Sequence, residues 1–368
     1  MDSGRSKKIP MKACFFHGLF VFALALYSCS IYTEQPQADG SQQNTNETPP
    51  NLGMNTSVPW AGQNLTGRLI FNIGIARNEG THTAIQSLDL ITGEVSTIFQ
   101  DLKDAWINDL AVSPNATVLV MSYTPPTDVG AQEALYEIPL DGSQPPRLFF
   151  TPPSDKDQYF QAAWSPDGKY LYFAHLNIQS KITYEIMRMV YPNGKPEKLV
   201  DHAYWPRLSD DGTRLVYVSI DPATGANSLF MANADGANSK QVPVTDLLTP
   251  MIIDAPMFSP DSQTILFSSP PKLQASVPLL SDKVFGVIVA AADGTIPSDW
   301  WSVPLSGGEP NRLTHLRSLG LFGSFAPDKK HIASYSTDGI FIMKPDGTGV
   351  SIVVNDVGGL SGTVSWIP

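Results

Sequence analysis

Cysteine is almost absent from this chain of 368 residues, which contains only Cys14 and Cys29. Both lie ahead of the region with strand-like patterns, so that region has no cysteine pair for an internal disulfide. A disulfide-stabilised scaffold is therefore excluded, and the fold has to be stabilised by the burial of apolar side chains.

Positive charge is also scarce. Lys and Arg number 24 against 35 Asp and Glu, a net charge of −11; without residues 1–28 the totals are 20 and 34, a net charge of −14. A protein that binds nucleic acid needs a basic face to neutralise phosphates. The composition therefore predicts no nucleic-acid partner.

The chain lacks the short motifs of common catalytic and metal sites. It contains no Gly-x-Ser-x-Gly nucleophile motif and no Asp-x-Asp-x-Asp-Gly calcium loop. The histidines beyond residue 28, none of which are spaced as His-x-x-x-His, are His82, His175, His202, His315 and His331. We therefore predict no catalytic residues, no metal site and no cofactor.

A strand-turn-strand pattern is abundant instead. In Ser165-Pro166-Asp167-Gly168, Pro fixes φ, Asp binds its own backbone and Gly supplies a positive φ, while aromatic and β-branched residues on both sides favour buried strands. Four further copies begin at Ser113, Ser209, Ser259 and Ala326. The spacings of 52, 44, 50 and 67 residues are typical of four-stranded propeller blades.

The two ends of the repeat region complement each other. Residues 68–99 contain three predicted strands without the Ser-Pro-Asp strand, and residues 362–368 supply that strand, with Trp366 at the position of Trp164. We therefore predict an all-β fold over residues 66–368. It is a six-bladed β-propeller of four-stranded antiparallel blades, closed by pairing of the N- and C-terminal strands.

The motif Trp164-Ser165-Pro166-Asp167-Gly168, with later turns such as residues 231–236, resembles the TolB-like β-propeller repeats over residues 67–368. This repeat class serves binding proteins, envelope proteins and the propeller halves of certain peptidases, so the resemblance implies a fold and no single function. Ser165, Asp167 and their equivalents are interpreted as turn residues.

The N-terminal segment has the pattern of an export signal. A basic region at 5–12 precedes an apolar run at 14–27, which is short for a membrane span. Leu26-Tyr27-Ser28-Cys29 resembles a bacterial lipobox, which implies removal of a lipoprotein signal peptide (1–28) and lipidation of Cys29; the alternative is an ordinary secretory signal with an incidental cysteine. Residues 29–65, rich in Gln, Asn, Thr and Pro, are predicted to form a disordered tether.

These patterns favour a monomeric, lipid-anchored binding or scaffold protein on the extracytoplasmic face of a membrane in the cell envelope. Its expected partners are the membrane and an envelope protein or a glycan. The sequence does not decide between the inner and the outer membrane. The alternative is an exported propeller enzyme, a lyase or hydrolase acting on carbohydrate at an axial site.

The predicted ligand site lies in the axial channel, because innermost strands line it and ligands bind in concave places. The aromatic and polar residues expected there are Trp106, Asn108, Tyr159, Tyr204, Trp205 and Asp254. The long insertion at 270–298 is either a lid or partner surface over one mouth of the channel, or additional packing. The sequence does not identify the ligand.

Replacement of the predicted lipidation site tests the anchor. We expect Cys29→Ala to move the protein from the membrane fraction to a soluble exported form, or to leave an unprocessed precursor, because no sulfur remains for acylation. Cell fractionation and mass spectrometry measure this. Cys14→Ala, within the predicted signal peptide, is the control, and unchanged detergent partitioning of correctly processed Cys29→Ala would contradict the prediction.

Overall fold

The computed structural model describes residues 60, 64–77, 80–126, 132–179, 182–245, 252–271, 297–358 and 362–368. The predicted signal peptide (1–28), Cys29 and nearly all of the predicted tether (29–65) lie outside these residues, as does most of the insertion at 270–298. Within the described ranges, no helix is long and apolar enough to cross a membrane.

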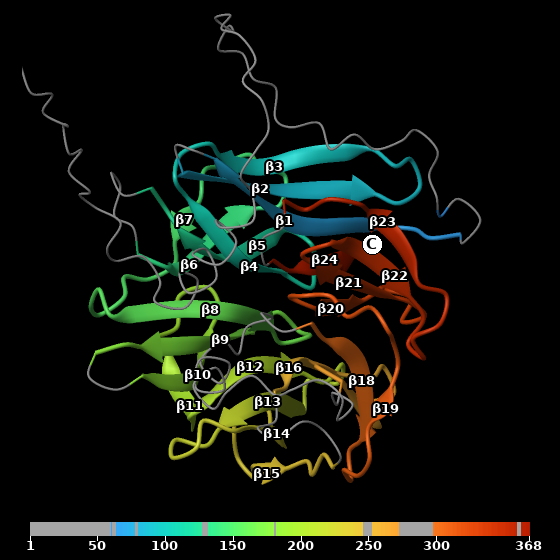
Figure 1. Cartoon of the computed structure of the whole chain (residues 1–368). Coiled ribbons are helices and arrows are strands. Elements are labelled where there is room, and N and C mark those ends of the chain that lie inside the picture. The colour runs from blue at the N-terminus through green and yellow to red at the C-terminus, as the bar shows by residue number, and fades with distance from the viewer. Residues whose placement is uncertain are drawn as a thin grey trace, which may run out of the picture. The chain divides into compact units, whose positions relative to one another are not determined.

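The described residues form six antiparallel sheets of four strands each (Figure 1). From the inner strand outward, they are β24 (Val364–Ile367), β1 (Arg68–Arg77), β2 (Gly80–Asp89) and β3 (Val95–Asp101); β4 (Trp106–Val112), β5 (Val118–Thr124), β6 (Ala134–Pro139) and β7 (Arg147–Leu148); and β8 (Asp157–Trp164), β9 (Tyr170–Asn177), β10 (Thr183–Val190) and β11 (Glu197–Asp201). The other three are β12 (Ala203–Leu208), β13 (Arg214–Ile220), β14 (Asn227–Asn233) and β15 (Lys240–Gln241); β16 (Asp254–Phe258), β17 (Thr264–Ser269), β18 (Asp299–Pro304) and β19 (Asn311–Arg312); and β20 (Phe322–Phe325), β21 (Ile332–Ser336), β22 (Gly339–Met343) and β23 (Ser351–Val354). Each blade is named below by its inner strand.

The six blades form a ring. Successive inner strands contact one another in the order β4, β8, β12, β16, β20, β24 and back to β4. The predicted all-β, six-bladed propeller of four-stranded antiparallel blades is therefore confirmed. The boundaries predicted for the signal peptide and the tether stay predictions.

The chain closes the ring by pairing its two ends. β24 is antiparallel to β1, with register from Arg68↔Ile367 to Phe71↔Val364, and Figure 1 shows the two strands side by side. The buried Asn72 accepts a hydrogen bond from the N–H of Thr363 at 2.9 Å and donates one to the carbonyl of Ile107 in β4 at 2.9 Å. One side chain of β1 thus joins the closing strand to the next blade.

Glycine is required where the closing strand passes the start of β1. Gly67 has φ +87, and a Cβ there would lie 2.2 Å from the carbonyl oxygen of Ile367. Any larger residue would have to displace the backbone of β24. The predicted closure by N- and C-terminal strands therefore has a local steric requirement as well as a hydrogen-bonded ladder.

The second strand of each blade forms most of the core. Both faces of this strand pack against neighbouring blades, so Phe71, Phe173 and Phe267 are fully buried. This explains why these strands read as continuous apolar runs rather than alternating patterns. Burial of each such side chain contributes about 1.5–3 kcal/mol to stability.

The Ser-Pro-Asp-type turns all have one geometry. In the turn between β8 and β9, the Ser165 hydroxyl donates to Asp167 Oδ1 at 2.6 Å and accepts from the N–H of Tyr170 at 2.8 Å. Gly168 in this turn has φ +69. A backbone bond of 2.8–2.9 Å closes every turn, from the first residue's N–H to the carbonyl five residues later: Ser113 to Val118, Ser165 to Tyr170, Ser209 to Arg214, Ser259 to Thr264 and Ala326 to His331. These serines and aspartates stabilise turns, as the sequence predicts.

The strand directions distinguish two faces of the ring. The Ser-Pro-Asp-type turns lie on one face, here called the turn face. The inner strands begin on the opposite face, which also carries the connections between blades and between the second and third strands; we call it the crossover face. The insertion at 270–298 has both ends on the crossover face. This follows from the pairing of Ser268 with Asp254 at the start of β16 and of Ser269 with Asp299 at the start of β18.

Removal of the closing strand tests the role of ring closure. Deletion of residues 362–368 is expected to unfold the propeller cooperatively, because it exposes the edge of β1 and the cores of two adjacent blades. Urea denaturation followed by circular dichroism measures this. Deletion of Pro368 alone, which is exposed and lies beyond β24, is the control; a 362–368 deletion as stable as this control would disprove the dependence on closure.

Candidate functional site

Hydrogen bonds from side chain to backbone connect successive inner strands around the axis. Asp109 Oδ2 in β4 accepts from the N–H of Gln161 in β8 at 2.7 Å, and Gln161 Oε1 accepts from the N–H of Trp205 in β12 at 2.8 Å. Thr363 Oγ1 accepts from the N–H of Leu110 at 2.8 Å, between the β24 and β4 blades. The polar residues at these positions therefore hold neighbouring blades together.

The two residues that donate backbone N–H groups to these inter-blade hydrogen bonds have an unusual backbone conformation. Gln161 and Trp205 have φ values of 56 and 55, and both lie where the register shifts between the inner strand and the second strand. A positive φ is rare for residues with side chains and is kept only where the surrounding structure stabilises it. Here each N–H is hydrogen-bonded to the preceding blade.

Tyr204 and Trp205, two of the aromatic residues predicted for the axial site, are packed inside the protein. Trp205 is 2% exposed, with the Phe322 ring at 4.9 Å and the Arg207 guanidinium 5.5 Å from its ring centroid. Tyr204 is also buried, and its hydroxyl accepts from Asn227 at 2.8 Å. The structure therefore leaves neither ring face open for stacking on a ligand.

The other four predicted site residues lie in the inner strands β4, β8 and β16. Trp106 and Asn108 are half-buried, and Asn108 donates to Glu133 Oε1 at 3.2 Å. Tyr159 and Asp254 are buried. The assignment of all six residues to ligand binding stays a prediction, as does lipidation of Cys29.

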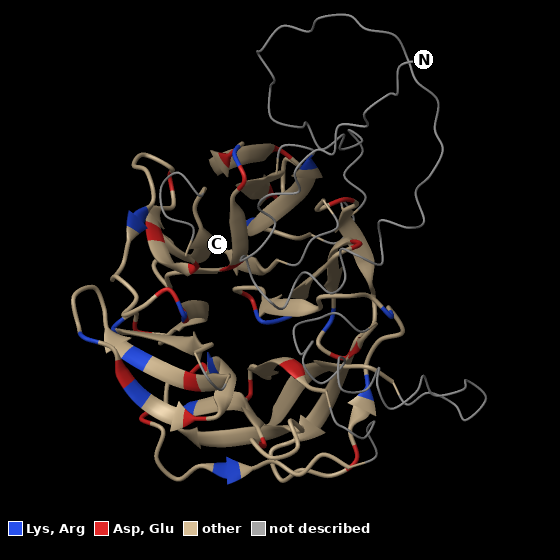
Figure 2. Cartoon of the chain, turned by 60° about the vertical axis from the view of Figure 1, so that its left-hand side comes forward, with Lys and Arg blue, Asp and Glu red and all other residues tan. Residues whose placement is uncertain are grey.

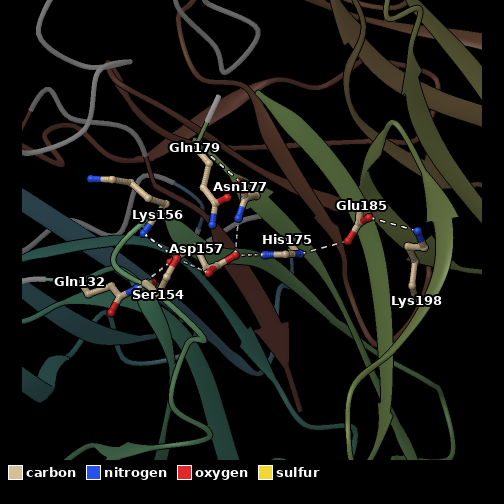
Figure 3. Close-up of polar contacts among 9 residues, drawn as sticks. All are labelled: Gln132, Ser154, Lys156, Asp157, His175, Asn177, Gln179, Glu185 and Lys198. Atoms are coloured by element: carbon tan, nitrogen blue, oxygen red, sulfur yellow. Dashed lines mark hydrogen bonds and ion pairs between the residues drawn. The ribbon is translucent and has the colours of Figure 1, made fainter. Parts of the chain in front are cut away.

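A polar network that sequence reasoning missed lies on the crossover face of the β8 blade (Figure 3). His175 Nε2 lies 2.7 Å from Asp157 Oδ1, and His175 Nδ1 lies 3.2 Å from Glu185 Oε2. Lys198 extends the network by donating to Glu185 Oε1 at 3.2 Å. Tyr159 stacks on the His175 ring at 4.8 Å.

The buried carboxylate of Asp157 is the centre of this network. It accepts from the Ser154 hydroxyl at 2.7 Å and from Asn177 Nδ2 at 2.7 Å, as well as from His175. Burial acts to raise the pKa of Asp157, but these hydrogen bonds and the charge of His175 outweigh burial and lower it. Burial and the charges of Asp157 and Glu185 also raise the pKa of Tyr159 to about 12.

His175 satisfies both carboxylates only as an imidazolium, because an ionised carboxylate accepts hydrogen bonds and a neutral imidazole has a single donor. Both ring nitrogens are then occupied. The network fixes the positions of β8, β9 and β10 and presents Glu185 and Lys198 at the surface. Strand register is the signal that predicts it, since His175 pairs with both Tyr159 and Glu185 and Asp157 pairs with Asn177.

A concave region lies off the axis, on the turn face between the β8 and β12 blades. It is a groove of about 580 Å³ lined by Ser165, Pro166, Asp167, Tyr170, Tyr172, Arg188, Asp211, Gly212, Thr213, Asn233, Ala234 and Asp235. Arg188 lies over the Tyr170 ring at 4.8 Å and is bonded to Glu197 through Nε at 2.9 Å. Hydrogen bonds from Ser209 and Thr213 lower the pKa of Asp211 to about 2.

Sequence reasoning did not anticipate this groove, and the axial ligand site stays a prediction. No group of three or more His, Cys, Asp or Glu residues among the described ranges is arranged to hold a metal ion.

The architecture has clear counterparts among solved structures. TolB from Acinetobacter baumannii superposes with a TM-score of 0.59 at 16% identity, covering 82% of this chain and 67% of that one. The fold is TolB-like. A candidate TolB from Agrobacterium tumefaciens has a TM-score of 0.52 at 16% identity, with 83% and 100% coverage, and a chain of the nidogen/laminin complex has 0.56 at 10% identity, with 81% and 97%. No protein-family model and no curated protein matches the sequence.

At these identities the likeness to TolB establishes the fold alone. The predicted recognition of a TolB-like propeller is confirmed. The same propeller geometry in the nidogen/laminin complex illustrates that one architecture serves unrelated proteins.

Neutralising Asp157 tests the polar network. Asp157→Asn is expected to lower stability by about 1–3 kcal/mol near neutral pH, because a buried charged acceptor of three hydrogen bonds is lost. Folding lowers the pKa of Asp157. The stabilisation by the ionised carboxylate is therefore complete above the unfolded-state pKa of about 4, and it is lost as the pH falls through the folded-state pKa. The difference from wild type should therefore shrink in acid.

Urea denaturation at neutral and acidic pH measures this difference. Asp155→Asn is the matched control, because the Asp155 side chain is 81% exposed and pairs only with the neighbouring Lys156. Equal stability of the Asp157→Asn and Asp155→Asn variants at neutral pH would contradict the proposed role of the network.

Proposed function

We propose that this protein is a lipid-anchored binding protein of the cell envelope. Cys29 holds it on the extracytoplasmic face of a membrane, residues 29–65 give the propeller reach, and the crossover face contacts a protein partner. The signal-like segment before Cys29 and the TolB-like fold support this location in the cell envelope.

The observation that carries the binding role is the network on the crossover face of the β8 blade. Its surface members carry both signs of charge: Lys198 is 47% exposed, Lys156 36% and Glu185 25%. Hydrogen bonds through His175 to the buried Asp157 hold Glu185 in place before any partner arrives. A charged group that is already ordered loses less entropy on binding, which favours affinity and register.

Charge of both signs favours a protein partner over a glycan or a nucleic acid. Figure 2 shows Lys and Arg interspersed with Asp and Glu over the described blades. Glycans are commonly bound by open aromatic rings, whereas Tyr159, Tyr204 and Trp205 are buried here. Complementary charges are typical of protein interfaces.

The geometry of the polar network also favours binding over the alternative of carbohydrate-directed catalysis. A general base needs a free nitrogen or oxygen within reach of the substrate proton. Both nitrogens of His175 face carboxylates, and the Ser154 hydroxyl donates to Asp157. These groups are therefore suited to fixing the positions of the surface side chains of the network.

Site-specific photo-crosslinking in intact cells tests the proposed surface. A photoreactive amino acid at Gln179 or Lys156 on the crossover face is expected to give one discrete adduct with an envelope protein. The same probe at Lys169 on the turn face is the matched control and is expected to give none. Glu185→Gln, which weakens the network, should reduce the adduct from Gln179.

Adducts from Lys169 alone, or equal adducts from both faces, would overturn the assignment of the crossover face. The absence of any adduct from Gln179 and Lys156 in membrane-anchored protein would overturn the proposal of a protein partner. Cys29→Ala examined in parallel separates loss of anchoring from loss of contact.

A further inference from the structure

One cationic side chain in the inner strands has no acidic partner within ion-pair distance among the described residues. Arg207, in β12, is half-buried, and its Nη1 donates to the carbonyl of Pro206 at 2.9 Å. Its guanidinium lies over the Trp205 ring. Asp109 of β4 is close enough to interact with Arg207 electrostatically, yet no ion pair joins them among the described residues. A charge pair near the axis is thus left separated.

Two buried polar atoms of this cluster have no hydrogen-bond partner in the part of the chain that the structure describes. They are Asp109 Oδ1 and Trp205 Nε1, on residues that are 4% and 2% exposed. Buried polar groups are usually paired, so such atoms call for an explanation. Asp109, Gln161 and Trp205 belong to one hydrogen-bonded chain across three successive blades, and Arg207 lies over the Trp205 ring and interacts electrostatically with Asp109.

Arg207 differs from the residues at equivalent positions of the other inner strands. Equivalent residues, two before the first residue of each Ser-Pro-Asp-type turn, are Ala111, Ala163, Met257 and Ser324. Arg207 is the only charged residue of this set and keeps partial exposure to solvent. A small solute therefore has a polar group to meet on its way to the buried atoms.

The chemistry of the three groups defines what would complete them. Arg207 and the Trp205 indole can only donate, and an ionised Asp109 can only accept. Burial raises the pKa of Asp109, and a cation beside it would favour the ionised form. The complement is an anionic acceptor and a cationic donor a few bonds apart, which is the arrangement in a free α-amino acid. An aromatic ligand is disfavoured because both faces of Trp205 are covered.

We propose that Asp109, Trp205 and Arg207 form an axial site for a free α-amino acid. Arg207 and Trp205 Nε1 bind the carboxylate, and Asp109 Oδ1 accepts from the ammonium group. The site is separate from the crossover-face surface, so it stands or fails independently of the partner proposed there.

A titration of the full chain with glycine tests this site. The indole N–H resonance of Trp205, assigned by its loss in Trp205→Phe, is expected to shift saturably with glycine. Acetate and methylammonium, which each carry one of the two charged groups, should bind about tenfold more weakly or worse, since each leaves one side unpaired. The midpoint temperature of thermal unfolding should rise as the glycine concentration increases.

Arg207→Gln should weaken glycine binding about tenfold or more, because it removes the charged donor. Arg214→Gln is the matched control: Arg214 lies in the same blade over the Phe258 ring at 5.4 Å, outside the cluster, and its replacement should leave binding unchanged. Asp109→Asn keeps an acceptor for Gln161 and should weaken glycine binding more than acetate binding.

The wild-type titration alone can overturn the proposal, whether or not the variants fold. A Trp205 indole resonance that does not respond saturably to glycine would mean that water satisfies these atoms. An equal response to glycine, acetate and methylammonium, or an unchanged response in folded Arg207→Gln, would equally refute the assignment.

Discussion

The antiparallel pairing of β24 with β1 is the contact on which the rest of the structure depends. It turns six separate sheets into a ring, so that every second strand is covered on both faces. Asn72 links this pairing to β4, and Thr363 of the closing segment binds the backbone of Leu110 in the same strand. The axis, the crossover face and the blade boundaries all take their geometry from six inner strands held at fixed positions.

The polar residues near the axis show how stability and function share one set of side chains. Asp109 and Gln161 each use an oxygen to hold the next blade. Within the described ranges, the second oxygen of Asp109 and the indole N–H of Trp205 have no hydrogen-bond partner. Binding groups and structural groups are therefore different atoms of the same residues, and each atom has to be considered separately.

The fold could be predicted because its determinants are local and repeated: Ser165 and Asp167 define a turn by themselves, and Trp366 matches Trp164 in its repeat. The site could not be predicted as well, because it depends on contacts between blades. The Trp205 ring packs against Phe322, two blades away, and Arg207, and Trp205 has a positive φ that the motif does not encode. His175 and Asp157 meet only through the register of β8 with β9. Cys29 and most of the 270–298 insertion lie outside the described residues.

The closing hydrogen bond of the Ser-Pro-Asp-type turns has a consequence for how such a protein diverges. Five turns with the same five-residue offset leave the turn face almost no freedom in length. Connections on the crossover face range in length from two residues, between β1 and β2, to 29 residues, between β17 and β18. Insertions and grafted loops are therefore accommodated by the crossover-face connections rather than by the Ser-Pro-Asp-type turns. New recognition properties can evolve there without refolding the blades beneath.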